Sequence, residues 1–453
     1  MNTPIVDFVS WYSDMKPVRL HMPGHKGVGP KGIEKLDITE ITGADSLYEA
    51  EGIIAASERN ASELFDTGIT LYSAGGSSQS VKAMCMLFAS VAVKNGYTGE
   101  NGRPIIAAGR NAHRSFIQAS ALTGFDISWI PGEEDSYSLC SSRITEEGLE
   151  SFLSGTSVKP AAVYITSPDY LGNMADIKGL SETAHRYGVP LICDNAHGAY
   201  LKFMPEDIHP ITLGADACVD SAHKTLPVLT GGGYLHISRD YREISIEEAR
   251  GAMSYFGSTS PSYLILESLD AANRWLSEEG SKAFLETFEK LSFLKWSLEM
   301  SGFRFIGDEP LKMTLDCIGS GFPTGDYIMN HLREEGIECE YSDPDYIVLM
   351  WSPFNREEDY ARVRNAFLTV PHTHIVHEEL TFTLPEKVYA PYETLLMCKE
   401  NVSVTQSLGR IAGDPDASCP PAVAPVISGE RINGESVRIL EYYGIEEISV
   451  IKE

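Results

Sequence analysis

The stretch Asp216-Ala-Cys-Val-Asp-Ser-Ala-His223-Lys224-Thr-Leu-Pro, which continues into Thr230-Gly-Gly-Gly-Tyr-Leu-His236, decides the fold of this chain. The apolar run 217–219 predicts a buried strand, and the run 234–237 predicts another one after three glycines. Lys224 lies in the polar turn between them. A lysine packed in a pocket at a strand end loses its proton more easily than a solvated one, and it can then bond a carbonyl cofactor. From this stretch alone, an ordinary solvated lysine stays an open alternative.

A second stretch, upstream, is typical of an anion site. The phrase Thr70-Leu-Tyr-Ser-Ala-Gly75-Gly76-Ser77-Ser78-Gln79 predicts a short strand, a glycine turn and a helix that runs to about Lys94. Free backbone amides at the start of a helix, with serine hydroxyls beside them, bind anions. Serine also caps many helices that bind no ligand, so the pattern is only moderately specific.

Strands and helices alternate between these two stretches. The predicted strands are 104–108, 126–130, 161–166, 190–194, 217–220 and 234–237. Helices such as 114–123 and 178–187 lie between most of them. Near-continuous apolar strands separated by helices predict an α/β fold with a mainly parallel sheet covered on both faces. Ligands of such sheets bind at the carboxyl ends of the strands. The polar residues expected there are Gly76, Ser77, Ser78, His113, Asp194, His197, Ser221, His223 and Lys224.

These residues match the chemical needs of one cofactor, pyridoxal 5′-phosphate. Its aldehyde needs a lysine, and Lys224 is placed for that bond. Its pyridine nitrogen stays protonated beside a carboxylate such as Asp194, and His113 can stack on the ring. Its phosphate needs amides and hydroxyls, and the groups expected to supply them are Gly76, Ser77, Ser78 and Ser221.

Each of these residues also has an ordinary structural interpretation. Asp194 could cap a turn, His113 could be a loop histidine, and His197 could be a hydrogen-bonding group of the core. One ligand accounts for the whole set, whereas the separate interpretations need an independent reason for each residue. The sequence therefore predicts a pyridoxal phosphate enzyme.

The chain resembles the bacterial ornithine/lysine/arginine decarboxylases, in their short form without an N-terminal receiver-like domain, over nearly its whole length. The phrases that carry the resemblance are His21-Met-Pro-Gly-His-Lys-Gly, Asp37-Ile-Thr-Glu-Ile, Arg110-Asn-Ala-His113-Arg-Ser115, Asp194-Asn-Ala-His197-Gly-Ala, Ser221-Ala-His223-Lys224-Thr-Leu-Pro, Ser258-Thr-Ser-Pro-Ser-Tyr263 and Pro425-Val-Ile-Ser-Gly-Glu-Arg-Ile432. The resemblance implies the aminotransferase-like fold type I: a large domain with a mainly parallel seven-stranded sheet, a small α/β domain and a C-terminal module. It also implies decarboxylation of arginine, lysine or ornithine to a polyamine-pathway amine and CO2.

The resemblance further implies a role for each catalytic residue. Lys224 bonds the cofactor aldehyde, and His223 is its phosphate-side neighbour. Either of these two residues returns a proton to the substrate Cα. His113 stacks on the cofactor ring, and Asp194 pairs with the pyridinium nitrogen. The residues beside this carboxylate are Ala196 and His197.

The same resemblance implies that the cofactor phosphate is held by two subunits. Ser77, Ser78 and Ser221 hold it from within the chain. Ser258 or Thr259 reaches across an interface to the partner's phosphate, which implies a homodimer with shared active sites and leaves a higher oligomer open.

Two departures from the family pattern lie close to the expected cofactor. The usual Asn-Gly-Ser/Thr-Thr phosphate loop is replaced by Gly75-Gly76-Ser77-Ser78, and the usual Leu-Thr-Gln is replaced by Leu229-Thr230 followed by three glycines. Both departures bear on substrate choice and on reaction outcome.

Another reaction on the same cofactor, such as transamination or elimination, stays open at this point. Aminotransferases clamp the substrate carboxylate with a small-domain arginine, for which Arg304, Arg333 and Arg356 are candidates. A catalytically silent binding protein is a further alternative. It predicts loss of the lysine or the carboxylate, yet both Lys224 and Asp194 are present.

Composition narrows the partners. The 453 residues hold 36 lysines and arginines against 64 acidic residues, a net charge of −28, which argues against nucleic acid or an anionic membrane as a partner. The partner that the family resemblance implies is a small basic amino acid. Eight scattered cysteines and an N-terminus without a signal pattern predict a cytoplasmic protein with reduced thiols.

The chain is predicted to divide into an N-terminal arm (1–55), a large cofactor-binding domain (56–261), a small α/β domain (262–371) and a C-terminal decarboxylase-type module (372–453). The arm is expected to be irregular, with helical periodicity over 49–65. A long helical stretch at 262–300 leads to small-domain strands at 311–317, 337–341 and 346–350. His372-x-His374-x-x-His377 lacks acidic or cysteine partners at metal spacing, so we expect loop histidines and no metal site.

Overall fold

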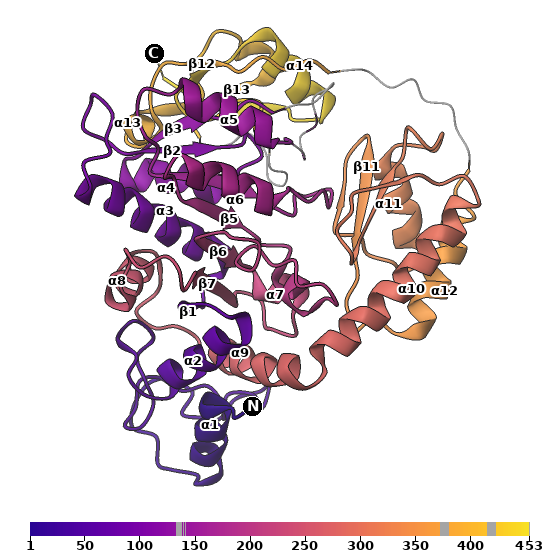
Figure 1. Ribbon diagram of the computed structural model, residues 1–453. Helices are drawn as coiled ribbons and strands as arrows, with labels where there is room; N and C mark the ends of the chain where they lie inside the picture. The colour runs from indigo at the N-terminus through magenta and orange to yellow at the C-terminus, as the bar shows by residue number, and fades with distance from the viewer. Residues whose placement is uncertain (133–137, 139, 141, 372–379, 415–422, 453) are drawn as a thin grey trace.

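The computed structural model describes residues 1–132, 138, 140, 142–371, 380–414 and 423–452 (Figure 1). His372, His374 and His377, predicted to be loop histidines, lie outside the described residues, as does Cys419. Within the described ranges, none of the helices combines the length and the apolar character that crossing a membrane requires.

A seven-stranded sheet forms the centre of the large domain (Figure 1). Its strands, in spatial order, are β1 (Ile69–Ser73), β7 (Gly233–Ile237), β6 (Ala217–Asp220), β5 (Leu191–Asp194), β4 (Ala162–Thr166), β2 (Ile105–Ala108) and β3 (Asp126–Trp129). The pairs from β6 across to β3 are parallel, whereas β7 runs antiparallel to both β6 and β1. The predicted α/β fold with a mainly parallel seven-stranded sheet is therefore confirmed, and each strand predicted between 104 and 237 lies within one residue of an observed one.

Helices cover both faces of this sheet. Because successive side chains of a strand point to opposite faces, β4 sends Ala162 and Tyr164 into one apolar cluster and Val163 and Ile165 into the other. The helices that contribute to the first cluster are α3 (Gly76–Lys94), α4 (Arg114–Thr123) and α8 (Ile246–Phe256). Those that contribute to the second are α5 (Glu146–Gly155) and α6 (Ile177–Arg186). Short helical turns lie at η2 (Ala199–Phe203) and α7 (Ala222–Thr225).

The sequence predicts an irregular N-terminal arm, and this prediction is wrong for its first part, which is helical. Residues Pro4–Asp14 form helix α1, which begins with a proline whose fixed φ suits a first helical position. Ile5 and Val9, four residues apart, are buried. The Asp270 carboxylate accepts from the free amides of Ile5 and Val6, a long-range cap that sequence periodicity does not reveal.

The helix predicted from residue 49 begins later, at α2 (Ile53–Phe65). The Asp45 carboxylate fixes this start, because it accepts from the backbone amides of Gly52 and Ile54. The residues before it form only a short 3-10 turn, η1 (Leu47–Glu49).

A long helical rod carries the chain from the large to the small domain (Figure 1). It consists of α9 (Tyr263–Trp275), a π-helical turn η3 (Leu276–Gly280) and α10 (Ser281–Glu299). The small-domain sheet has the order β10 (Tyr341–Ser342), β11 (Tyr346–Met350), β9 (Lys312–Asp316) and β8 (Phe305–Ile306). Its core is completed by α10, α11 (Gly325–Glu334) and α12 (Glu357–Phe367).

The strand predicted at 337–341 is wrong over most of its length, since only Tyr341 belongs to β10. Gly336 takes a left-handed φ of +73°, and the Ile337 amide donates to the carbonyl of Leu332. These residues therefore close helix α11 and are not available to a sheet.

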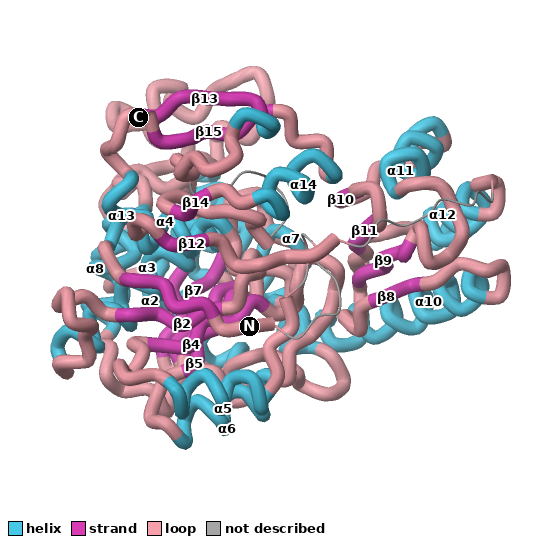
Figure 2. The backbone as a smooth tube through the Cα atoms, turned by 90° about the horizontal axis from the view of Figure 1, so that it is seen from above, coloured by secondary structure: helices cyan, strands magenta, loops and turns pink. Residues whose placement is uncertain are grey.

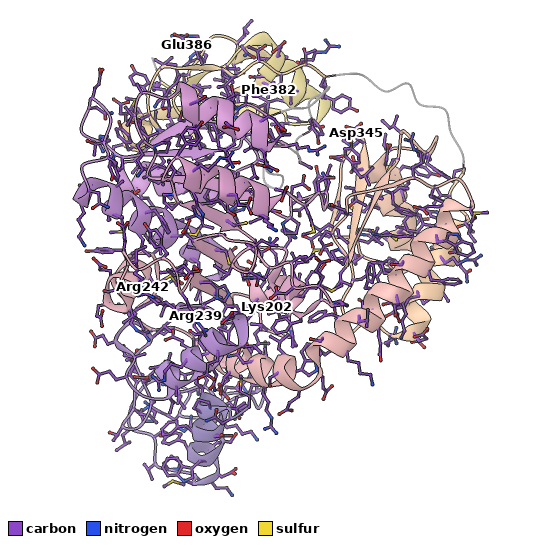
Figure 3. All side chains as sticks on the ribbon, in the orientation of Figure 1. Lys202, Arg239, Arg242, Asp345, Phe382 and Glu386 are labelled. Atoms are coloured by element: carbon purple, nitrogen blue, oxygen red, sulfur yellow. The ribbon has the colours of Figure 1, made fainter. Side chains whose placement is uncertain are left out.

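The C-terminal module lies over the β2–β3 edge of the large domain (Figure 1), and Figure 2 shows its helix α14 on the side towards the small-domain strand β10. Its elements are β12 (Glu386–Lys387), α13 (Pro391–Thr394), β13 (Lys399–Ser403), η4 (Val404–Gln406), β14 (Glu430–Arg431), α14 (Gly434–Tyr442) and β15 (Glu447–Ile451). It contacts the small domain through the Tyr442 hydroxyl, which donates to the Asp345 carboxylate at 2.6 Å. Asp345 is labelled in Figure 3. The domain boundaries given above stay predictions.

Candidate active site

The lysine turn is held between β6 and β7 by close backbone packing. A Cβ at Gly233 would lie 2.9 Å from the Asp220 carbonyl oxygen and 3.3 Å from the carbonyl carbon of Gly76. Gly231, with φ +99°, accepts from the amide of Gly76 at 2.7 Å. The absence of side chains at the glycines therefore lets this turn pack closely against the start of α3. This packing is a structural reason for the departure from the family pattern at 231–233.

Lys224 reaches the end of the neighbouring strand. Its Nζ lies 3.0 Å from Nε2 of His197, which follows β5. The Lys224 side chain is exposed in the single chain, so one chain alone does not close the pocket that the sequence argument required. The preceding residue, His223, has its Nδ1 2.9 Å from the carbonyl oxygen of Gly232.

Asp194 ends β5 as a buried, hydrogen-bonded carboxylate. Its Oδ2 accepts from the Tyr164 hydroxyl at 2.8 Å, and its Oδ1 accepts from the amide of Ala196 at 3.2 Å. Tyr164 lies on the adjacent strand β4, so the parallel register brings the two side chains together. A carboxylate fixed in this way can hold a positive N–H group in front of it.

His113 begins helix α4 as its N-cap, where Nδ1 accepts from the amide of Ser115. Burial lowers the pKa of His113 to about 4, Asp194 opposes this shift, and Lys224 adds to it. The ring is therefore uncharged at neutral pH. A flat, neutral ring near both Asp194 and Lys224 is suited to stacking on a planar ligand.

The start of α3 combines a glycine turn with serine hydroxyls, the features that the predicted anion cradle needs. Gly76, the first residue of the helix, has a left-handed φ of +69°, and a Cβ there would contact the His223 ring at 3.7 Å. The Ser221 hydroxyl donates to the Ser77 hydroxyl at 2.7 Å, and Ser78 lies on the same helical turn. The structure thus brings the hydroxyls of residues 77 and 221 together beside free helix amides.

Several buried polar atoms at the same sheet edge have no hydrogen-bond partner among the described residues. They are Thr166 Oγ1, Asn195 Oδ1, His197 Nδ1 and Thr225 Oγ1, which follow or end strands β4, β5 and β6. Buried polar groups are normally hydrogen-bonded. A cluster of buried polar atoms without partners is therefore expected where a polar ligand binds. With the lysine, the carboxylate and the cradle, they fit the aldehyde, the ring and the phosphate of pyridoxal phosphate.

Ser258 and Thr259 are not brought to this site within the chain. Both are exposed after α8, where the Ser258 hydroxyl accepts from the amide of Ser260. No hydrogen bond in the described part of the chain joins either one to the other predicted site residues. Their loop begins at Gly257, where a Cβ would lie 2.4 Å from Nε2 of Gln79. The loop therefore starts close to the first turn of α3.

Sequence reasoning missed residues that join the site to distant parts of the chain. Tyr164 and the buried Lys312 are two of them, and their signal was a polar side chain inside an otherwise apolar strand. A third is Asp220, whose Oδ2 lies 3.1 Å from His209 Nε2 and 3.3 Å from His236 Nε2, all fully buried. Burial alone would raise the pKa of Asp220, but the two histidines hold it below its usual range, so a carboxylate anchors the lysine turn.

Comparisons with known proteins agree with this geometry. The model of the family described as "Orn/Lys/Arg decarboxylase, major domain" matches residues 3–306. The arginine decarboxylase of Bacillus subtilis (strain 168) is 27% identical over 96% of this chain and 92% of its own length. The lysine decarboxylase of Francisella novicida has a TM-score of 0.79 at 16% identity, covering 99% of this chain and 81% of that one. The constitutive lysine decarboxylase of E. coli has a TM-score of 0.77 at 17% identity, covering 100% and 82%.

At such low identity the two solved structures show the fold alone, and they agree with the aminotransferase-like architecture. The family model is the stronger finding, because it matches most of the chain, including the lysine turn, Asp194 and the cradle. On this evidence the chain belongs to the Orn/Lys/Arg decarboxylase family, whose members are pyridoxal phosphate-dependent amino acid decarboxylases.

Proposed function

We propose that this protein converts arginine, lysine or ornithine to the corresponding amine and CO2, with pyridoxal phosphate bound at Lys224. One observation carries the proposal: His113, Asp194 and Lys224 follow or end the parallel strands β2, β5 and β6, whose carboxyl ends share one edge of the sheet, and Asp194 and Lys224 both act on the His113 pKa. When bound, the cofactor supplies an aldehyde that bonds amines and a ring that accepts electrons.

Each residue of the chain has a distinct task in this proposal. Lys224 holds the aldehyde, Asp194 keeps a proton on the pyridine nitrogen, and the neutral His113 stacks on the ring face. The residues that hold the phosphate within the chain are Gly76, Ser77, Ser78 and Ser221, and those beside the ring are Ala196 and His197. After CO2 has left, Nζ of Lys224 would return a proton to the substrate Cα, with His223 as its neighbour in sequence.

Decarboxylation is favoured over transamination by the surroundings of the candidate arginines. Arg333 and Arg356 are exposed and make ion pairs with Glu338 and Asp359. Arg304, also exposed, donates to the carbonyl of Gly319. These contacts hold all three on the small-domain surface, which leaves a substrate carboxylate near Lys224 without an arginine clamp from them.

A homodimer is part of the proposal. The arm exposes large apolar side chains, and Val18, Leu20 and Val28 are 86%, 88% and 79% exposed. A second copy that covered them would bury apolar area. Ser258 and Thr259 would then reach the partner's phosphate. Replacing Leu20 by Glu should shift the protein towards monomer in sedimentation experiments, whereas Leu396→Glu, a change at an equally exposed leucine of the C-terminal module, should not.

The amines formed would enter polyamine synthesis, and we propose a cytoplasmic site of action. Of the described cysteines, Cys398 is exposed and Cys339 partly so, while Cys85, Cys193 and Cys218 are among those buried as free thiols. Free thiols of this kind suit a reducing compartment.

The test is to incubate the protein and pyridoxal phosphate with each of the three amino acids, and to measure CO2 and the amine formed. Borohydride reduction followed by peptide mapping should place the cofactor on Lys224, and Lys224→Ala should lose both label and turnover. Amino transfer to a keto acid without CO2 release, or a label on another residue, would overturn the proposal.

A further inference from the structure

A loop of the large domain is hydrogen-bonded to the small domain and leads directly to the active site. This segment, residues 169–174, follows β4 and is called the seam loop below. Several small-domain groups donate hydrogen bonds to its carbonyls: Lys312 Nζ to Asp169 (3.1 Å) and Tyr170 (3.4 Å), and Thr314 Oγ1 to Leu171 (2.7 Å). The backbone amides of Asp308 and Glu309 both donate to the carbonyl of Gly172 (2.9 Å each). In the other direction, the Met174 amide donates to Asp308 Oδ1 (2.8 Å). The position of the seam loop is thus set by the small domain.

Tyr170 is the residue of the seam loop that points back to the site. Its carbonyl accepts from the buried Lys312, and its hydroxyl donates to Glu340 Oε1 at 3.0 Å, so both ends of the residue are fixed by the small domain. Its ring meets the ring of His197 edge-on, with centroids 5.3 Å apart and planes at 75°. The small domain is therefore linked to His197 through Tyr170, a side chain of the large domain that it holds in place.

His197 in turn contacts the reactive lysine. Its Nε2 is 3.0 Å from Nζ of Lys224, whereas its Nδ1 is buried without a hydrogen-bond partner among the described residues. Burial, followed by Lys224 and Lys312, holds the pKa of His197 well below its usual range, so the ring is neutral and Nε2 can accept from an ammonium group. The edge-on packing against Tyr170 therefore helps to set the orientation of this ring.

We propose that Tyr170 is a positioning residue for Lys224: it holds His197 as the hydrogen-bond acceptor of the lysine nitrogen and so couples the small domain to the chemistry. The inference rests on the proposed role of Lys224. Because a hydrogen bond to the charged form favours that form, loss of the Tyr170 ring should lower the pH at which this nitrogen titrates. Among the described residues, the other charged or titratable groups that act on this cluster include His113, His223, Asp194, Lys312, Glu309, Asp169, Glu340, Lys82 and Arg114.

The test compares three variants of the holoenzyme. Tyr170→Leu removes the ring, and Tyr170→Phe keeps the ring but loses the bond to Glu340. Tyr442→Leu removes a different tyrosine that binds the small domain, through Asp345, and serves as the matched control. The first readout is the pH midpoint of the visible absorption of the Lys224–cofactor bond. The second, in cofactor-free protein, is the pH dependence of Lys224 acetylation by acetic anhydride, followed by peptide mapping.

We expect Tyr170→Leu to lower both midpoints by roughly one to two pH units, the range that loss of one hydrogen bond to a charged group gives. Turnover should fall about tenfold with KM changed less than about twofold, because an interaction made during the reaction is lost and binding is not. Tyr170→Phe should restore the midpoints to within about 0.2 units, and Tyr442→Leu should leave them unchanged. If Tyr170→Leu does not fold, Tyr170→Met makes the same test with a longer unbranched chain.

Unmoved midpoints in folded Tyr170→Leu or Tyr170→Met would overturn the inference, as would an equal shift in Tyr442→Leu. Borohydride mapping of every variant separates this failure from that of the proposed function. A label on Lys224 with unmoved midpoints rejects only the role of Tyr170. A label absent from Lys224 in the unaltered protein rejects the proposed function itself.

Discussion

Arg110 and Glu430, 320 residues apart in the chain, form a bidentate ion pair in which both Nη–Oε distances are 2.7 Å. The two side chains are only 5% and 3% exposed, and Nε of Arg110 also donates to the carbonyl of Ala424. Arg110 stands three residues before His113. The pair thus fixes the C-terminal module to the loop that presents the ring proposed to stack on the cofactor.

Removing one partner of this pair should be costly. Glu430→Gln leaves the Arg110 charge buried and unpaired, so we expect the free energy of unfolding to fall by about 3–5 kcal/mol in urea titrations. Glu386, labelled in Figure 3, supplies the control, because its ion pair with Arg431 is equally short at 2.8 Å but solvent-exposed. Glu386→Gln should cost no more than about 1 kcal/mol. Equal losses in the two variants would contradict the role given to the buried pair.

Much of the sheet and the strand-end residues could be predicted, because both depend on local pattern. Apolar runs set the strands, and the parallel order then requires His113, Asp194 and Lys224 to share one edge. Contacts between distant segments could not be predicted in this way. Helix α1 needs the Asp270 carboxylate as its cap, and the link from Lys312 through Tyr170 to His197 joins residues that no periodicity relates.

The left-handed φ of Gly76 predicts opposite effects of alanine at two glycines. Gly76→Ala forces a Cβ into a conformation that costs roughly 1–2 kcal/mol and moves the amides of the phosphate cradle. We expect weaker pyridoxal phosphate binding, measured by absorbance titration, together with lower stability. Gly251, inside helix α8, has an ordinary φ and open space around its Cβ, so Gly251→Ala should stabilise the protein by about 0.5–1 kcal/mol. A cofactor affinity unchanged in Gly76→Ala would argue against the cradle.

Asp194→Asn tests the proton held on the cofactor ring. The amide keeps the shape of the side chain and can still accept from Tyr164, but it has no charge to stabilise a pyridinium. We expect kcat to fall on the order of 10²-fold or more while the borohydride label stays on Lys224, since the covalent bond does not need the carboxylate. Tyr164→Phe, which removes only the hydrogen-bond donor to Asp194, should cost far less. A kcat within about twofold of the unaltered enzyme in Asp194→Asn would remove this residue from the mechanism.

The buried Asp343 should make stability fall as the pH rises. Burial raises its pKa to about 7, an effect that the Tyr346 amide opposes and that Asp345 increases. Below about pH 4 the folded and unfolded states both carry the proton, so the group contributes no pH dependence there. Between about pH 4 and pH 7 only the folded state keeps it, so the free energy of unfolding declines by up to about 1.4 kcal/mol per pH unit.

Asp343→Asn should remove this slope, because an amide does not titrate and its oxygen can still accept from the Asp345 and Tyr346 amides. Relative to the unaltered protein, the variant should therefore gain in Tm as the pH is raised from 4.5 to 7.5 in thermal unfolding experiments. Asp359→Asn is a control of opposite sign. The Arg356 amide, then its side chain, lowers the pKa of this partly exposed carboxylate, so its contribution is present at neutral pH and is lost as the pH falls. Asp359→Asn should thus lose Tm mainly at the higher pH. If the Tm of both variants instead changed with pH in the same direction, Asp343 would be ionised in the folded protein.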